Sequence, residues 1–298
     1  METLRSNNAN RSNFNRGSMN LPSGASLDFS GAAIVMGIVN CTGDSFYAGS
    51  HNMNSEEALG RALDQAEQGA GIIDFGGEST RPGAAYVPEE EEIRRVIPVI
   101  EAFRKRASTP VSVDTRKARV AQLALDAGAD IINDISALED EPAIGPLCAQ
   151  RGAALILMHK KGVPADMQDK PFYTDVVREV SDYLLKAADR AKGYGVPGEK
   201  IIVDPGIGFG KRTGDNLELI ANLDQLCALG YPLLMALSRK TVVGSLTGRD
   251  ATERLAGTLA ANAVSLMEGA LIIRVHDVKE TVDLVKVIHG IRSRRRAA

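Results

Sequence analysis

The chain lacks tryptophan altogether and holds only three cysteines and four histidines among its 298 residues. Cys41, Cys148 and Cys227 lie far apart and form no C-x-x-C pair, which argues against a disulfide framework and against a zinc site. Such cysteine usage is typical of a reducing compartment, so we expect a cytoplasmic protein.

The sequence also has no large excess of charge of one sign. The 35 basic and 38 acidic residues give a net charge of −3, which offers no electrostatic reason to expect nucleic acid or an anionic membrane as partner. The short basic end at 292–296 has no second basic cluster to support it, so we expect it to be solvated.

The first thirty residues contain no apolar run of the length that a signal peptide or a membrane span requires. They are rich in Asn and Ser, and we predict that residues 1–30 form a disordered extension. Residues 31–298 are then expected to form one domain, because a single barrel of this length is ordinary.

From Ala32 onward, short apolar runs alternate with longer segments that have a helical pattern. The runs lie at 34–39, 71–74, 110–114, 130–133, 153–158, 200–204, 232–237 and 270–275. The helical segments lie at 55–68, 89–106, 117–126, 141–150, 174–194, 215–229, 252–268 and 278–291. Runs that are apolar throughout are typical of parallel strands buried on both faces. We therefore predict an α/β protein that folds as a single (β/α)8 barrel.

Gly-Ala pairs recur where a helix should end and the next strand begin. They start at Gly69, Gly128, Gly152 and Gly269, and we predict that these glycines cap helices rather than bind a ligand.

Polar residues follow every predicted strand. They are Asn40, Asp74, Asp114, Asn133 with Asp134, His159, Asp204, Ser238 to Lys240, and Arg274 with His276. A single strand-end aspartate is simply explained as a helix cap, but eight polar strand ends in register favour a site at the mouth of the barrel. The stretch 74–83, with its glycines, hydroxyls and arginine, points to the same mouth.

The residue types at this mouth suggest a ligand with two parts. Asp114, Asn133, Asp134, Asp204 and Lys240 can surround a small polar heterocycle that carries both donors and acceptors. Four basic side chains suit phosphate; they are Arg81, Arg239, Arg274 and His276. The glycines of 204–211 would let Phe209 lie flat over a ring while Asp204 binds its edge.

Taken in order, these motifs resemble dihydropteroate synthase, a family of pterin-binding barrels, over about nine-tenths of the chain. The motifs are V-M-G-I-V-N at 35–40, D-S-F at 44–46, G-E-S-T-R-P-G-A at 77–84, S-V-D-T at 112–115, I-I-N-D at 131–134, L-M-H at 157–159, D-P-G-I-G-F-G-K at 204–211, S-R-K at 238–240 and R-V-H-D at 274–277. Each motif alone is moderately specific, whereas all of them in order are very specific.

The resemblance implies an enzyme of folate biosynthesis that condenses 7,8-dihydropterin-6-ylmethyl diphosphate with 4-aminobenzoate. The products are 7,8-dihydropteroate and diphosphate, formed by a dissociative, SN1-like substitution. The resemblance also implies a Mg²⁺ cofactor, a sulfonamide target and a homodimer built on the late helices.

Individual residue roles follow from the resemblance. The pterin site comprises Asp114, Asn133, Ile135, Met158, Asp204, Phe209 and Lys240. The diphosphate site comprises Asn40, Arg81, Arg274 and His276, with Asn40 also a ligand of Mg²⁺. The 4-aminobenzoate pocket comprises Phe46, Thr80, Pro82 and Thr241. The residues expected to act in catalysis are Asp44, Lys240, Arg274 and His276, and Asp44 would stabilise the developing cation.

The sequence departs from the family pattern at a few positions. Gly43, Ala48 and Ala236 replace residues that are usual in the family, and Arg116 and Lys160 replace less charged ones. Two other functions stay open at this point. One is a methyltetrahydrofolate-corrinoid methyltransferase, against which the basic 79–83 and 274–276 motifs argue, and the other is a non-catalytic pterin-binding paralogue.

Overall fold

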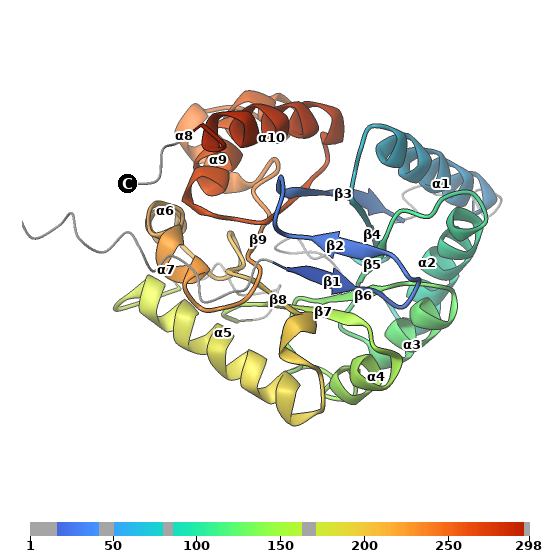
Figure 1. The fold of residues 1–298 in the computed structure, drawn as a ribbon. Coiled ribbons are helices and arrows are strands. Elements are labelled where there is room, and N and C mark those ends of the chain that lie inside the picture. Colours follow the sequence, from blue (N-terminus) through green and yellow to red (C-terminus); the bar gives the residue numbers. More distant parts are fainter. Residues whose placement is uncertain (1–16, 42–50, 80–85, 163–170, 295–298) are drawn as a thin grey trace, which may run out of the picture.

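The computed structural model describes residues 17–41, 51–79, 86–162 and 171–294, with only the backbone of residues 51–54. Within these ranges, eight parallel strands form a sheet in the order β8-β7-β6-β5-β4-β3-β10-β9, surrounded by helices (Figure 1). A parallel bridge between Val203 and Leu233 joins the two ends of the sheet and closes the barrel. The predicted (β/α)8 fold is confirmed.

The elements follow one another along the chain as strand and helix. The barrel strands are β3 (Ile34–Asn40), β4 (Ile72–Gly76), β5 (Val111–Asp114), β6 (Ile131–Asp134), β7 (Ala154–Met158), β8 (Ile201–Asp204), β9 (Leu234–Met235) and β10 (Ile272–Val275). The helices are α1 (His51–Glu67), α2 (Glu89–Arg104), α3 (Ala118–Asp126), α4 (Ile144–Arg151), α5 (Val176–Gly193), α6 (Thr213–Ala221), α7 (Leu223–Cys227), α8 (Thr241–Thr247), α9 (Leu255–Glu268) and α10 (Val278–Arg292).

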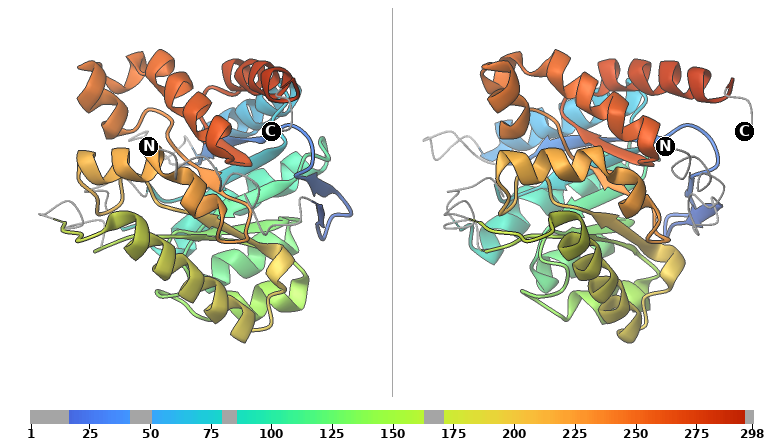
Figure 2. Two further views of the ribbon diagram at one scale, coloured as in Figure 1. Left: turned by 60° about the vertical axis from the view of Figure 1, so that its left-hand side comes forward. Right: turned by 90° about the vertical axis from the view of Figure 1, so that its left-hand side faces the viewer.

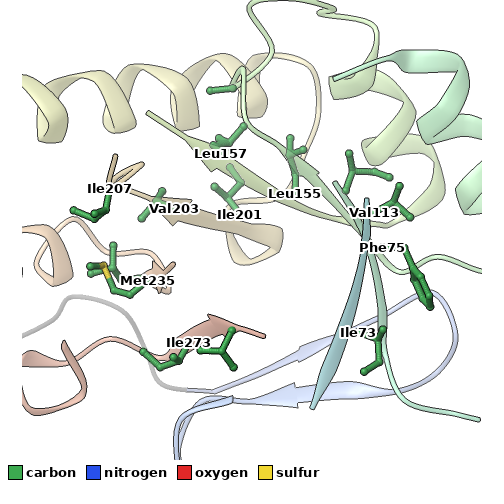
Figure 3. Packing of buried hydrophobic residues seen from close by; sticks show 14 of the residues in the cluster. Ile73, Phe75, Val113, Leu155, Leu157, Ile201, Val203, Ile207, Met235 and Ile273 are labelled. Carbon is green, nitrogen blue, oxygen red and sulfur yellow. The ribbon is translucent and has the colours of Figure 1, made fainter. Parts of the chain in front are cut away.

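Alternate side chains of each strand face the barrel interior and the helix layer, because neighbouring residues of a strand point to opposite faces. Ile73 and Phe75 of β4 pack with Val113 and Leu155 in the layer under the helices (Figure 3). Ile72, their neighbour, belongs instead to a separate apolar cluster inside the barrel. Since both faces of a strand are buried, most of its residues are apolar.

Several element boundaries differ from the predictions. The segment predicted as one helix at 215–229 is two helices, α6 and α7, separated at Asn222, whose φ of −119° and ψ of 32° leave the helical region. The helix α8 was not predicted, and the run at 232–237 contributes only the two residues of β9. The four predicted cap glycines all adopt positive φ, from 63° at Gly152 to 120° at Gly269, as a left-handed helix end requires.

The prediction of a disordered segment up to residue 30 is wrong for residues 17–30. Strands β1 (Ser18–Asn20) and β2 (Ser26–Asp28) form an antiparallel hairpin that lies at one end of the barrel (Figures 1 and 2). Its apolar side chains are buried against the interior cluster of the strands; they are Met19, Leu21, Leu27 and Phe29. We call this end the floor of the barrel. Residues 1–16 lie outside the described residues.

Hydrogen bonds from the strand starts hold the hairpin in place. Ser23 N donates to Oδ1 of Asp130 at 3.0 Å, and Val111 N donates to Oδ2 of the same side chain at 3.0 Å. Arg104 of α2 forms an ion pair with Asp130, and Lys200 Nζ donates to the Asn20 carbonyl. Among the described residues, no helix combines the length and the apolarity that crossing a bilayer requires.

Candidate active site

An arginine and two aspartates from three strands meet at the opposite end of the barrel, which we call the mouth. Arg274 of β10 donates from Nε to Asp74 Oδ2 at 2.6 Å and from Nη2 to Asp114 Oδ2 at 2.9 Å. Asn133 of β6 adds a longer contact, with Nδ2 3.4 Å from Asp74 Oδ2. Side chains that lie 200 residues apart in the sequence are thus brought together by the closed sheet.

The two carboxylates at this mouth are only half satisfied. Oδ1 of Asp74 and Oδ1 of Asp114 are both buried and have no hydrogen-bond partner among the described residues. A buried acceptor without a donor costs about 1–3 kcal/mol, and more if it is charged. A ligand that brings N–H groups to these oxygens would recover that free energy.

Burial and like charge change the acidity of the mouth. Burial raises the pKa of Asp114 to about 7, and although Arg274 opposes this, the charges of Asp74, Glu92 and Asp134 add to it. Burial also raises the pKa of Asp204, against the opposing effect of Lys240. The proton affinity of these carboxyls is therefore set by the site, as is usual where a ligand is bound or a reaction takes place.

A lysine and an aromatic ring lie on the other side of the mouth. Lys240, which follows β9, donates to the carbonyl of Ile207 and places its Nζ 4.7 Å from the ring centroid of Phe209. Burial lowers the pKa of Lys240 to about 8, although the Asp204 carboxylate works in the opposite direction. Asp204 itself accepts a hydrogen bond from Gly206 N at 2.7 Å, which turns the chain into the loop that carries Phe209.

Comparison with known proteins decides between the pterin-binding functions. A family model described as pterin binding enzyme matches residues 36–276. Dihydropteroate synthase of Escherichia coli K12 is 45% identical over 270 residues, which cover 91% of this chain and 95% of the relative. The chain belongs to the dihydropteroate synthases.

Solved structures of this family share the fold as well as the sequence. Dihydropteroate synthase of Xanthomonas albilineans with 4-aminobenzoic acid has a TM-score of 0.86 at 44% identity, covering 93% of this chain and 100% of that one. A Yersinia pestis dihydropteroate synthase with a sulfonamide drug complex has a TM-score of 0.85 at 42% identity, covering 91% and 98%. These relatives favour the synthase over a corrinoid methyltransferase.

Most residues that the sequence assigned to the pterin lie at the mouth. Asp114, Asn133 and Asp204 are almost fully buried at the ends of three strands, and Lys240 and Phe209 lie beside them. Ile135 follows β6 and is 5% exposed, and Met158 is the last residue of β7 and is 3% exposed.

The residues predicted to bind diphosphate and aminobenzoate are placed in part. Asn40 is exposed at the end of β3, and Thr241 is exposed at the first turn of α8. His276 follows β10, and its Nδ1 lies 3.0 Å from Ser238 Oγ. Five predicted residues lie outside the described residues; they are Asp44, Phe46, Thr80, Arg81 and Pro82.

Two aspartates have roles other than those the sequence suggested. Asp134 does not join the mouth, because its Oδ1 accepts from Ser136 Oγ at 2.6 Å and its Oδ2 from Leu138 N at 2.7 Å, as in a turn cap. Asp74 was given no ligand role, yet it is fully buried and holds Arg274. A charged residue inside the apolar run 72–75 was the available signal, since a buried charge needs a partner.

The charged departures from the family pattern are paired at the rim. Arg116 Nη1 lies 3.0 Å from Asp140 Oδ2, and Lys160 Nζ lies 3.0 Å from Asp140 Oδ1. Arg116 also reaches Glu78 at 3.3 Å. These replacements therefore tie together the loops that follow β4, β5, β6 and β7.

Proposed function

We propose that this chain condenses 7,8-dihydropterin-6-ylmethyl diphosphate with 4-aminobenzoate to give 7,8-dihydropteroate and diphosphate. The observation that carries the proposal is the convergence of Asp114, Asn133, Asp204 and Lys240 on one mouth, next to the cation of Arg274. Acceptors and donors in this arrangement suit the edge of a pterin ring, and the neighbouring cation suits the diphosphate.

The pterin would bind with its edge to the buried polar groups and its faces to apolar side chains. The carboxylate of Asp204 can accept parallel hydrogen bonds from a ring N–H and the adjacent amino group. Oδ1 of Asp114, which has no hydrogen-bond partner among the described residues, supports a second donor contact from the ring. Phe209, Met158 and Ile135 would line the ring faces, and Asn133 and Lys240 would complete the edge.

The diphosphate would bind to Arg274 and His276, together with Arg81. The double contact of Arg274 with Asp74 and Asp114 fixes its guanidinium beside two carboxylates of the mouth. The two halves of the first substrate would then bind to neighbouring groups of the protein. The aminobenzoate pocket would then be formed by Thr241 with Phe46, Thr80 and Pro82.

The residues at the mouth fit a Mg²⁺ ion that takes few ligands from the protein. Among the described residues, no three His, Cys, Asp or Glu side chains are grouped so that they could hold a metal ion. Mg²⁺ commonly binds through one or two protein oxygens with water and substrate phosphates, and the amide oxygen of Asn40 offers such a ligand. When bound there, Mg²⁺ would neutralise charge that develops on the leaving diphosphate.

The reaction would begin with cleavage of the bond between the pterin methylene and the diphosphate oxygen. The electron pair leaves with the diphosphate, where Arg274 and His276 stabilise the charge. The dihydropterin ring delocalises the cation, Asp44 stabilises it electrostatically, and Lys240 and Asp204 hold the ring. The neutral aniline nitrogen of 4-aminobenzoate then attacks the methylene and loses a proton, so no side-chain nucleophile is needed.

A coupled assay of diphosphate release tests the proposal. We expect release that depends on both the pterin diphosphate and 4-aminobenzoate, with 7,8-dihydropteroate formed in equal amount. Steady-state release that 4-aminobenzoate does not accelerate, or no release at all from a folded protein, would contradict the proposed reaction. The second outcome together with tight pterin binding would identify a non-catalytic paralogue.

A homodimer and a cytoplasmic location are further parts of the proposal. Three apolar side chains on the late helices, Val264 of α9 with Val287 and Ile291 of α10, are about half exposed, which supports a second copy as their partner. Sedimentation of the full chain should give twice the monomer mass. No disulfide joins the three cysteines, which all lie within the described residues, in keeping with a reducing compartment.

A further inference from the structure

A second lysine is buried directly behind the pterin half of the mouth. Lys211 ends the loop that follows β8 and is 2% exposed. Its Nζ lies 2.8 Å from His159 Nδ1, 3.0 Å from the Gly206 carbonyl and 3.2 Å from the Phe209 carbonyl. An ammonium group has three donors, and this cage supplies three acceptors.

His159 is fixed so that its ring faces this lysine. Its backbone N–H donates to the Asp204 carbonyl at 3.0 Å, which continues the pairing of β7 with β8. Its ring packs edge to face against Tyr183, with centroids 4.7 Å apart. Burial lowers the pKa of His159 far below its ordinary value, and the charge of Lys211 adds to this, so the ring is neutral and Nδ1 can accept.

The loop from Asp204 to Lys211 is pressed against the end of β7. A Cβ atom at Gly206 would lie 1.8 Å from the His159 carbonyl, and one at Gly210 would lie 2.0 Å from the Lys161 carbonyl. Both glycines adopt positive φ, so no other residue fits these two positions. The backbone of the loop can therefore pack in only this position, on the side where Lys211 is buried.

Two lysines hold three backbone carbonyls of this loop. Lys211 takes those of Gly206 and Phe209, and Lys240 takes that of Ile207. The loop begins at Asp204 and carries the Phe209 ring before it ends at Lys211. Burial lowers the pKa of Lys211 well below its ordinary value, and the negative charge of the Asp204 carboxylate opposes this.

We propose that Lys211 and His159 act as a positioning pair that sets Asp204 and Phe209 in the geometry that the pterin requires. This inference rests on the proposed pterin site. Neither side chain need touch the substrate, because Lys211 acts through the carbonyls of Gly206 and Phe209, and His159 orients Lys211. The pair therefore governs pterin recognition and leaves the aminobenzoate pocket alone.

The test compares pterin binding with aminobenzoate kinetics in the full chain. In Lys211→Met, calorimetry with the bare pterin alcohol should show binding at least tenfold weaker, and KM for the pterin diphosphate should rise by a similar factor. KM for 4-aminobenzoate should stay within twofold. Lys161→Met is the matched control, since the Lys161 side chain is 44% exposed and pairs with Glu179, and it should leave both quantities within twofold.

Two variants of His159 separate positioning from folding. His159→Asn keeps an acceptor toward Lys211, so its pterin affinity should stay within threefold of that of the wild-type chain. His159→Leu removes the acceptor, so its loss of pterin affinity should match that of Lys211→Met. If Lys211→Met does not fold, this His159 pair alone decides the matter. Equal loss for both substrates, no difference between His159→Asn and His159→Leu, or unchanged pterin binding would overturn the proposal.

The binding measurement also separates this inference from the proposed reaction. A wild-type chain that binds the pterin alcohol without releasing diphosphate would refute the reaction and still allow the positioning pair to be tested. A wild-type chain that binds no pterin would refute the pterin site, and with it the role of the pair.

Discussion

The two ends of the barrel are built from the same strands but treat buried charge in opposite ways. At the floor, Asp130 accepts hydrogen bonds from Ser23 and Val111 and pairs with Arg104. At the mouth, Asp74 and Asp114 share one arginine, and each retains an oxygen that no described residue satisfies. The buried charge at the floor has its partners within the protein, and the charge at the mouth has only some of them.

The difference separates stability from function. A fully paired carboxylate under an apolar hairpin stabilises the fold, whereas crowded and partly paired carboxylates cost folding free energy until a ligand arrives. In barrels of this class, conserved function is expected at the strand ends and stability at the strand starts. Changes at the two ends should therefore move different measurements.

The largest effect is expected from the floor. Phe29→Ala removes a ring that is 2% exposed in the interior cluster and should lower the free energy of unfolding by about 3–5 kcal/mol. Pterin affinity should not change in the fraction that stays folded. Chemical denaturation and calorimetry measure the two quantities. Phe172→Ala, at a ring 66% exposed, is the control and should cost less than about 0.5 kcal/mol.

The next largest effect belongs to the mouth and should have the opposite signature. Asp204→Asn presents a donor to a donor of the pterin, so affinity should fall by about 3 kcal/mol, or roughly a hundredfold. Stability should hold or rise, since burial disfavours the charged carboxylate and the amide oxygen can still accept from Gly206 N. The comparison variant is Asp130→Asn, which should lose stability and keep pterin affinity. The same response from both variants would erase the distinction between the two ends.

A smaller effect should distinguish the diphosphate part of the mouth from its pterin part. Arg274→Lys keeps the positive charge near Asp74 and Asp114 but loses the planar fork that suits phosphate. Binding of the pterin diphosphate should weaken by about 2 kcal/mol, roughly thirtyfold, while binding of the pterin alcohol changes less than threefold. Titration calorimetry with the two ligands measures this, and an equal loss for both would assign Arg274 to the pterin edge.

The smallest effect, counted per pH unit, is a pair of opposite pH dependences. Folded Asp114 keeps its proton up to a pH of about 7, whereas the unfolded chain releases it near 3.8, so the folded state binds more protons in between. Stability without ligand should therefore fall as pH rises from about 4 to about 7. Pterin binding needs the ionised carboxylate, so its affinity should rise over the same window, by at most about tenfold per pH unit. Parallel slopes in denaturation and binding titrations would contradict this assignment.

The barrel could be predicted from the sequence because its signals are local. The strands are rich in apolar residues, the helices that were predicted have an apolar stripe, and the cap glycines lie where helices end. The register of polar strand ends followed from the parallel sheet alone, so Asp114, Asn133 and Asp204 could be placed at one mouth without coordinates.

The hairpin was missed because the Asn- and Ser-rich composition of this segment predicted disorder, although its apolar residues alternate as in strands. Asn and Ser dominate residues 1–30, yet Met19 and Leu21 alternate with polar residues, as do Leu27 and Phe29, around the turn residues at 22–24. Alternation on both sides of a Pro-Ser-Gly turn is a hairpin signal. It is a weak one, since such short strands fold only against a surface that lies elsewhere in the chain.

The contacts that organise the mouth could not be predicted at all. The pairing of Asp74 with Arg274 and of His159 with Lys211 joins residues 200 and 52 positions apart. Nothing in the local sequence specifies which buried carboxylate an arginine contacts, or which carbonyls a lysine cages. Such pairs depend on the closed barrel, because only closure fixes the distance between strand ends.

The hairpin at the floor also sets a condition on the time course of folding. Lys200, which donates to the Asn20 carbonyl, follows it by 180 residues, so the hairpin leaves the ribosome long before its partner exists. At about 5–20 residues per second, that interval is roughly 10–40 s. An isolated two-stranded hairpin is only marginally stable in water, so Met19, Leu27 and Phe29 have no stable surface to pack against during this period. Closing the floor is therefore a late step of folding, and the nascent chain depends on protection of these side chains until β8 has been made.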